Sequence, residues 1–198
     1  VSSTPTSNDF IGVTSGGHHN CALRSSGGIT CWGRDDFKQV SDAPSSNDFI
    51  GVSAGIWHTC ALHSTGGITC WGRNDQGQVS NAPSSNDIVD MSGGGNHHCA
   101  LLSNGEITCW GFDRYGQVSN TPNSNDFIGI SSGMDHNCAL RSTGELTCWG
   151  NDSNWHYLTP TSNDFIGVSS GIWQNCALRT TGEITCWGND AHRVVSDA

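Results

Sequence analysis

The chain has 198 residues, of which 34% are hydrophobic and only 13% are charged, about half the charged share of an ordinary soluble domain. Its formal net charge of −10 repels phosphate backbones, so a nucleic-acid partner is not expected. No apolar run approaches the ~18 residues that a membrane span needs, and no membrane insertion is expected. Ten cysteines, an even number, indicate an oxidising compartment unless the thiols bind a metal.

A Cys-Trp pair recurs along the chain at intervals of 39, 39, 39 and 38 residues. A fixed period of this length is typical of repeat architectures. The five pairs are Cys31-Trp32, Cys70-Trp71, Cys109-Trp110, Cys148-Trp149 and Cys186-Trp187. We therefore expect a single repeat domain over residues 1–198, built from units at approximately 1–39, 40–78, 79–117, 118–156 and 157–198.

Each unit is predicted to contain short strands in the same order. In the first unit, Phe10–Val13 predicts one strand, and the alternation in Cys21–Leu23 and Ile29–Trp32 predicts two more. The segment Arg24–Gly28 between them has the residues of a hairpin turn. In the second unit, Gln78–Ser80 predicts a weaker fourth strand. Helices are not expected, because no apolar stripe of period 3.6 survives among the glycines.

A sheet of three or four such strands is only marginally stable alone and must pack against neighbours. Five sheets placed radially, with Trp and Phe side chains between them, form a β-propeller. The predicted fold is therefore all-β, a β-propeller of five short blades with three to four strands each. An open superhelical array of the same units is the alternative.

The two cysteines of every unit lie ten residues apart. In a hairpin centred on Ser26, Cys21 lies opposite Cys31, at ~4.5–5.5 Å between Cα atoms, which a disulfide can bridge. We predict one disulfide within each blade. The predicted pairs are Cys21–Cys31, Cys60–Cys70, Cys99–Cys109, Cys138–Cys148 and Cys176–Cys186.

Zinc is the alternative use of these cysteines. Four units have a histidine two residues before the first cysteine, at His19, His58, His97 and His136, and could form a Cys₂His set. The fifth unit has Gln174 instead, and no Cys-x₂-Cys knuckle occurs. We therefore expect no metal and no cofactor, and we expect these histidines to bond neighbouring backbone groups. Recurring Asn-Asp pairs, which could suggest calcium, are better explained as Asx-turns before a strand.

The second unit resembles the repeat of the regulator of chromosome condensation family in Gly55–Leu62, Gly67 and Cys70–Val79. The resemblance recurs five times and covers nearly the whole chain. It implies a β-propeller, often seven-bladed, among relatives that are nucleotide exchange factors, chromatin binders or bacterial β-lactamase inhibitors. The repeat length is similar to that of the inhibitors. The acidity, the regular cysteine pairs and the five units depart from the nuclear members, so a nuclear exchange factor is not expected.

Two segments differ between units, one before the first cysteine and one after each Trp-Gly. They contain aromatic, amide and charged side chains of kinds that stack on sugars or form protein hot spots. Drift of unconstrained loop tips is the alternative explanation. The candidate ligand-binding residues are His18, Trp57, His98, Asp135, Trp173, Tyr115 and Trp155.

No nucleophile elbow, phosphate loop or zinc-protease motif is present, and enzymatic activity is not expected. Scattered carboxylates leave a glycosidase pair possible in principle. The sequence predicts a secreted, extracellular recognition module for a glycan or a protein.

A second hypothesis comes from the chain ends. Val1–Thr4 and Val195–Ala198 both match Val40–Ala43, so both ends would compete for one position in a closed ring. Either one end is displaced, or the chain pairs head-to-tail with a neighbour. In the second case, the alternative function is a structural subunit of an extracellular filament or array. The sequon at Asn151-Asp152-Ser153 makes Asn151 a candidate glycosylation site.

Overall fold

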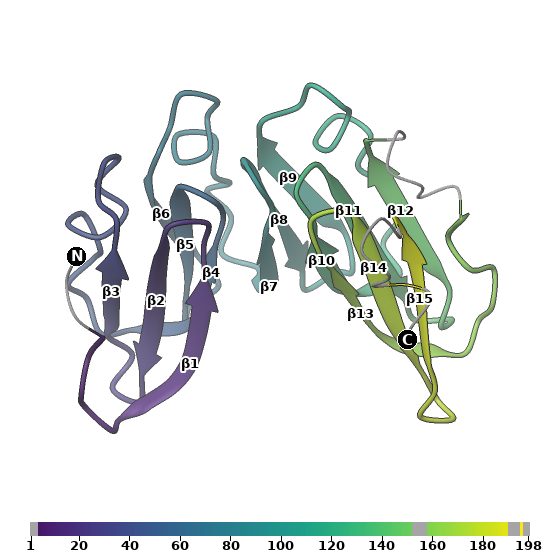
Figure 1. Cartoon of the computed structure of the whole chain (residues 1–198), viewed down its shortest axis with the longest axis horizontal. Coiled ribbons are helices and arrows are strands. Elements are labelled where there is room, and N and C mark those ends of the chain that lie inside the picture. Colours follow the sequence, from purple (N-terminus) through teal and green to yellow (C-terminus); the bar gives the residue numbers. More distant parts are fainter. Residues whose placement is uncertain (1–3, 152–157, 190–194, 196–198) are drawn as a thin grey trace.

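A computed structural model describes residues 4–151, 158–189 and 195, which include five three-stranded antiparallel sheets (Figure 1). In every sheet the spatial order of the strands is their order in the chain. The strands are β1 Phe10–Ser15, β2 His19–Arg24 and β3 Ile29–Gly33 in blade 1; β4 Phe49–Ala54, β5 His58–His63 and β6 Ile68–Gly72 in blade 2; β7 Ile88–Gly93, β8 His97–Leu102 and β9 Ile107–Gly111 in blade 3; β10 Phe127–Ser132, β11 His136–Arg141 and β12 Leu146–Gly150 in blade 4; and β13 Phe165–Ser170, β14 Gln174–Arg179 and β15 Ile184–Gly188 in blade 5.

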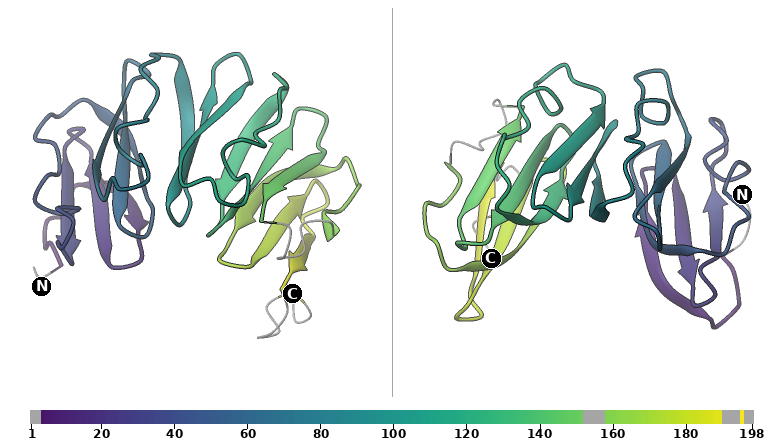
Figure 2. Two further views of the ribbon diagram at one scale, coloured as in Figure 1. Left: turned by 90° about the horizontal axis from the view of Figure 1, so that it is seen from above. Right: turned by 180° about the vertical axis from the view of Figure 1, so that it is seen from behind.

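The blades stand side by side in an arc, with blade 1 and blade 5 at its two ends (Figures 1 and 2). The first strand of each blade contacts the first strand of the next: β1 with β4, β4 with β7, β7 with β10 and β10 with β13. These strands therefore lie innermost, which is the arrangement of a β-propeller. The predicted fold class is confirmed.

The hairpin register explains why the cysteine spacing is constant. Cys21 pairs directly with Cys31 across β2 and β3, and the other four blades repeat this register. The chain reverses through a turn in which Gly27 has a φ of 83°, a conformation that glycine adopts without a steric penalty. The first strand has a bulge between Phe10 and Gly12, which leaves Ile11 exposed. Every blade carries this bulge.

Gln78–Ser80 forms turns rather than the weak fourth strand expected from the sequence. The backbone N–H groups of Val79 and Ser80 both donate to Asn74 Oδ1, at 3.0 and 2.9 Å. Gly77 precedes them with a φ of 78°, which breaks the extended conformation. Gln78 is fully buried, and its carbonyl oxygen accepts a bond from Trp110 Nε1 of the next blade at 2.9 Å. The segment thus joins two blades instead of extending one.

The hydrophobic core lies between blades. Cys21 and Leu23 on one face of blade 1 pack against Phe49, Ala61 and Trp71 of blade 2. Three further clusters repeat this arrangement between blades 2 and 3, 3 and 4, and 4 and 5. Each interior blade therefore buries a Cys-Leu face against the blade that follows and an Ala-Trp face against the blade that precedes.

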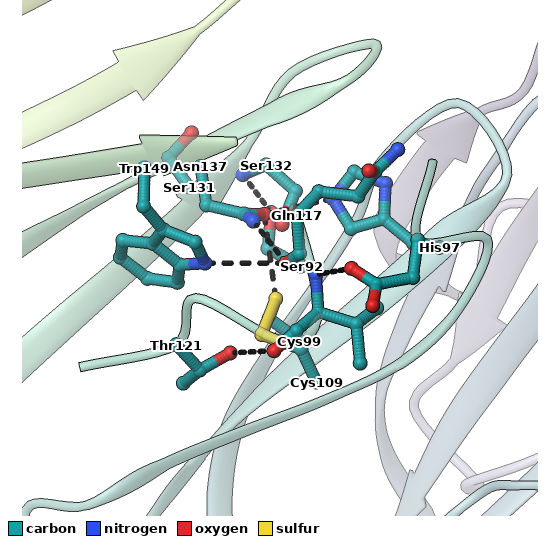
Figure 3. Close-up of a disulfide and its surroundings, with 12 residues drawn as sticks. Ser92, His97, Cys99, Cys109, Gln117, Thr121, Ser131, Ser132, Asn137 and Trp149 are labelled. Atoms are coloured by element: carbon teal, nitrogen blue, oxygen red, sulfur yellow. Dashed lines mark hydrogen bonds between the residues drawn. A yellow bond between two sulfur atoms is a disulfide. The ribbon is translucent and has the colours of Figure 1, made fainter. Parts of the chain in front are cut away.

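All ten cysteines form the five predicted disulfides, each within one blade and with Cα–Cα distances of 4.0–4.1 Å. Figure 3 shows the Cys99–Cys109 disulfide of blade 3, with Asn137 and Trp149 of blade 4 beside it. The pairing leaves no free thiolate for the zinc alternative. No helix among the described residues is long and apolar enough to cross a membrane.

Replacing Cys99 and Cys109 together by Ala should lower the free energy of unfolding by about 2–3 kcal/mol, because the bridge closes a short loop in the unfolded chain. Chemical denaturation followed by circular dichroism measures this loss. Peptide mapping without reduction should give five pairs, each within one repeat. A linkage between repeats would contradict the assignment, and an unchanged stability in the double variant would contradict a stabilising role.

Candidate functional site

The turns between the first and second strands of all five blades meet around one cavity of about 500 Å³. These turns, residues 16–18, 55–57, 94–96, 133–135 and 171–173, coincide with the first variable segment of the repeat. Glycines form much of the wall, and His18, Ile56, Met134 and Ile172 add larger side chains. The propeller thus brings together five segments that lie about 39 residues apart in the sequence.

The glycine that begins each turn is required by the side chain beneath it, which is a histidine in blades 1 to 4 and Gln174 in blade 5. A Cβ on Gly94 would lie only 2.2 Å from Cε1 of His97 and 2.7 Å from the carbonyl oxygen of Gly133 in the next blade. Both groups belong to the packed interface between blades 3 and 4. The frame of the cavity is therefore constrained by packing, while the two residues that follow the glycine differ between blades.

The recurring histidines form a buried row that connects successive blades through side chains rather than through the backbone groups expected from the sequence. Each Nε2 lies within hydrogen-bond distance of the residue just before the first cysteine of the next blade. The pairs are His19 with Thr59 Oγ1 at 2.6 Å, His58 with His98 Nδ1 at 2.7 Å, His97 with Asn137 Oδ1 at 2.8 Å and His136 with Asn175 Oδ1 at 2.9 Å. The histidines are thus part of the interfaces between blades.

Burial keeps several of these histidines uncharged at neutral pH. It lowers the pKa of His97 to about 4 and that of His98 to about 3, because a charged imidazole loses its hydration there. Burial also lowers the pKa of His58 well below its usual value, and the nearby His98 adds to this shift. The row therefore has a structural role that depends on neutral imidazoles.

His98 does not lie on the candidate binding surface. Its side chain is fully buried, accepts or donates in the bond with His58, and stacks on Trp110 with ring centroids 5.5 Å apart. His98 differs from the other candidates because it occupies the last position of the variable segment, directly before the first cysteine of the blade. The side chain at this position points inward and is Thr, Asn or His in the different blades. Sequence variation at this position reflects the interface between blades.

Between blades 1 and 2, the two variable segments meet in an aromatic cluster. His18 is exposed and stacks on Trp57 with ring centroids 4.0 Å apart. Phe37, from the loop after β3, contacts the same indole edge-on at 5.3 Å. The guanidinium of Arg34 lies 5.3 Å from the centroid of Trp57, and that of Arg73 lies 5.3 Å from the centroid of Phe37. We call these five residues the rim cluster.

Backbone bonds hold the two variable segments together in every blade. Arg34 N donates to the carbonyl oxygen of His18 at 2.9 Å, and Arg73 N donates to that of Trp57 at 2.9 Å.

Arg34, Phe37 and Arg73 were not among the predicted site residues. The signal that could have found Arg34 and Arg73 is that each directly follows a Trp-Gly in a chain with only 8 basic residues.

The remaining candidates do not belong to the rim cluster. Trp173 is 38% exposed beside the exposed Ile172, and no ring partner contacts it within the described part of the chain. Asp135 is partly buried, which raises the pKa of its carboxyl. Tyr115 is exposed and contacts Phe112 edge-on at 6.2 Å. Trp155 lies outside the described residues.

The aspartate of each Asn-Asp pair lies at the end of its blade that is opposite the cavity. In four of the blades, this aspartate forms an ion pair. Asp9 pairs with Arg24, Asp126 with Arg141 and Asp164 with Arg179 at 2.6–2.7 Å, and Asp48 pairs with His63 at 2.7 Å. These partly exposed pairs contribute little to stability individually. Across residues 4–151, 158–189 and 195, no group of three or more His, Cys, Asp or Glu side chains could hold a metal ion.

Comparison with solved structures gives the same architecture. The entire ectodomain of the Physcomitrella patens receptor kinase CR4 matches with a TM-score of 0.75 and 27% identity, covering 90% of this chain and 50% of that one. The CRINKLY WD40 ectodomain of the Arabidopsis thaliana receptor kinase ACR4 matches with a TM-score of 0.74 and 24% identity, covering 90% and 65%. The chain therefore spans only part of these relatives.

Yeast RCC1 (Prp20), in a structure with Kap60 bound, matches with a TM-score of 0.73 and 15% identity, covering 91% of this chain and 56% of that one. Among proteins with curated functions, none matches the sequence. The model of the regulator of chromosome condensation (RCC1) repeat matches residues 10–39, 49–78, 88–117 and 127–154, more than half of the chain. Together with the five blades and their common strand order, this match shows that the chain belongs to the RCC1 repeat family.

Proposed function

We propose that the protein is a non-enzymatic, extracellular recognition module that binds a protein or a glycan through the variable loops around the central cavity. The main observation behind this proposal is that the turns between the first and second strands of all five blades line one cavity. The variable loops present Trp, Tyr and Arg, the residue types enriched in protein binding hot spots. This composition favours a protein partner over a glycan.

An extracellular location is supported by the disulfides of all five blades, since such bonds persist in oxidising compartments. Two of the similar structures are ectodomains of receptor kinases.

Secretion and glycosylation are parts of this proposal. Asn151 is largely buried, so a sugar on its side chain requires a local rearrangement, and an intact mass above the sequence mass by hexose increments would support its modification.

The rim offers two different aromatic surfaces. Trp57 already stacks on His18 and lies beside the guanidinium of Arg34, so its faces are engaged within the protein. Trp173 is exposed and, among the described residues, has no ring contact. We therefore expect Trp173 to contribute more than Trp57 to the direct contact with a partner, and Trp57 to act by shaping the rim cluster.

Screening the intact protein on arrays of extracellular proteins and glycans tests the proposed function. For any ligand found, Trp173→Ala should weaken binding by about 30-fold or more, the effect of losing a hot-spot residue worth ~2 kcal/mol. Ile128→Ala is the matched control, because Ile128 is an exposed apolar residue on the inner strand of blade 4. Isothermal titration gives both affinities. Equal affinities for the two variants would contradict the rim as the binding surface.

A second candidate function is a structural subunit of an extracellular array formed by head-to-tail association. The segments at 1–3 and 196–198, on which the end-pairing hypothesis was based, lie outside the described residues.

A further inference from the structure

At the end of the blade opposite the cavity, the last side chain of the second strand bonds three neighbouring side chains. In blade 4, Arg141 Nη1 donates to the two carboxylate oxygens of Asp126 at 2.7 and 2.9 Å and to Ser124 Oγ at 3.1 Å. Its Nε donates to Thr147 Oγ1 at 3.0 Å. The corresponding Asp, Ser and Thr of blades 1 and 5 accept in the same way from the arginines at the end of their second strands, Arg24 and Arg179.

Blade 2 has a histidine in place of the arginine. His63 Nδ1 lies 2.7 Å from Asp48 Oδ2, and His63 Nε2 lies 2.8 Å from Thr69 Oγ1. Ser46 also bonds Asp48. Four blades thus place a nitrogen-bearing side chain among the same three neighbours. We call the Asp, Ser and Thr in these positions the acceptor set of a blade.

Blade 3 retains the acceptor set without the donor. Its members are Ser85, Asp87 and Thr108, and its second strand ends in Leu102. No group among the described residues bonds the side chains of these three members, and Ser85 Oγ is buried. In blades 4 and 5 the corresponding serine donates to the aspartate, so blade 3 also lacks the bond that forms where an arginine is present.

The backbone around the acceptor set is the same in blade 3 as in the other blades. Leu102 pairs with Ile88 in the register that every blade has at this point. Ser103 N donates to the carbonyl oxygen of Asp87 at 2.8 Å, and the other blades have this bond at 2.8–2.9 Å. Leu102 packs on the core cluster that contains Ile88 and has no N–H to donate. Blade 3 therefore differs in side-chain chemistry rather than in backbone position.

We propose that the acceptor set of blade 3 binds the guanidinium of an arginine on the surface of a partner protein. The molecule itself holds a guanidinium among an Asp, a Ser and a Thr at these positions in blades 1, 4 and 5, so the acceptor set matches that group in size and in hydrogen bonds. Asp87 supplies the opposite charge. The formal net charge of −10 also suits a basic partner, since opposite charges steer two proteins together.

An arginine carried by a protein fits this position better than a free small cation does. Asp87 is exposed, and an exposed ion pair contributes little affinity by itself. Stable binding therefore needs further contacts, which the surface around a protein's arginine provides. Val89, two residues after Asp87 in the chain, is 53% exposed and gives such a surface an apolar side chain to cover.

This second surface is independent of the proposed binding through the variable loops. It lies at the end of the blade opposite the cavity, on a blade that packs against blades 2 and 4 (Figure 1). Trp173→Ala, which tests the variable loops, should therefore leave binding at the acceptor set of blade 3 unchanged. Failure of one proposal can thus be distinguished from failure of the other.

Nuclear magnetic resonance of the intact protein tests the proposal with N-acetyl-arginine amide, whose only charge is the guanidinium. In proton–nitrogen correlation spectra, the backbone amides of Ser85, Asp87 and Thr108 should show saturable shifts. N-acetyl-citrulline amide, which has a similar shape without the charge, should leave these amides unchanged. Asp87→Asn should abolish the saturable shifts, because it removes the opposite charge. Leu102→Arg should also abolish them, because the chain's own guanidinium then occupies the acceptor set.

Arg141→Leu is the matched control, because it gives blade 4 the side chain that blade 3 has at this position. The amides of Ser124, Asp126 and Thr147 should not respond in the wild type and should respond to the arginine compound in this variant. Circular dichroism melts and non-reducing peptide maps should show that all variants are folded with native disulfides.

Three results would overturn the proposal. The first is the absence of saturable shifts at the acceptor set of blade 3 in the wild type. The second is an equal response to the citrulline compound, which would show that the charge is not recognised. The third is an undiminished response in the Asp87→Asn variant, which would place the binding elsewhere.

Discussion

Replacing Trp110 by Ala should destabilise the protein by about 3–5 kcal/mol, the cost of removing a large aromatic side chain from a core. Trp110 is 3% exposed and packs in the cluster that contains Cys60 and Leu62 of blade 2. Its Nε1 donates to the carbonyl oxygen of Gln78 at 2.9 Å, so the substitution also leaves a buried acceptor without its partner. The substitution therefore weakens the interface between blades 2 and 3 rather than the packing within one sheet.

Urea unfolding followed by far-ultraviolet circular dichroism measures this change without depending on tryptophan fluorescence. Trp173→Ala provides the control, because that indole is 38% exposed and should cost less than ~1 kcal/mol. Trp110→Phe should have an intermediate effect, since it keeps most of the apolar contact and loses the bond. Equal stabilities of the Trp110→Ala and Trp173→Ala variants would show that the interfaces between blades do not carry the fold.

The second large effect is a loss of stability in mild acid. An unfolded histidine has a pKa near 6.5, whereas burial lowers the pKa of His97 to about 4 and that of His98 to about 3. Below pH 6.5 the unfolded chain therefore binds protons that the folded chain does not. The stability contributed by the neutral imidazoles is present above pH 6.5 and falls as the pH drops toward the folded pKa values.

Between pH 6.5 and 4.5 each of these two histidines should remove on the order of 2–3 kcal/mol from the free energy of unfolding. Asp9 contributes little in this window, because an unfolded aspartate has a pKa near 3.9. The bond with Arg24 lowers the pKa of the folded carboxyl further, so the stability from that bond is lost mainly at more acidic pH. The neighbouring imidazoles of His58 and His98 add to the effect, since protonating one raises the cost of protonating the other. Acid should therefore first weaken the contact between blades 2 and 3.

His98→Asn tests this assignment, because Asn at the same position accepts the histidine bond in blades 4 and 5. The variant should lose less stability than the wild type over the same pH range, by on the order of 2–3 kcal/mol. His18→Asn, at an exposed position, is the matched control and should follow the wild type. Urea titrations at a series of pH values give the comparison. If the His98→Asn variant lost as much unfolding free energy between pH 6.5 and 4.5 as the wild type, groups other than His98 would be responsible for the acid sensitivity.

The strand order and the disulfides were predictable because they depend on contacts close in the sequence. The ten-residue spacing of Cys21 and Cys31, with glycines at the turn, specifies one hairpin register. The fourth strand was predicted wrongly from Gln78–Ser80, where one apolar residue, Val79, lies between two polar ones. The decisive interactions there are the side-chain cap from Asn74 and the bond to Trp110 of the next blade, which no local pattern reveals.

The candidate site was predictable only in part. Variation between the repeats identified His18, Trp57 and Trp173, which lie on or beside the rim of the cavity. The same criterion also selected His98, which is buried. Variable positions in a repeat mark both surface residues and residues that adapt to a neighbouring blade, and the sequence does not distinguish these two causes.

By itself, the sequence determined the repeat, the hairpin register, the five disulfides and the separation of each strand into two apolar sides. Those features follow from alternation and spacing within about 39 residues. Only the tertiary structure decided which side faces the next blade, how the two variable loops combine into the rim cluster, and which faces of blades 1 and 5 are left exposed. The physical reason is that these contacts join positions one repeat apart, and a repeat pattern, being the same in every unit, carries no information about how successive units are oriented.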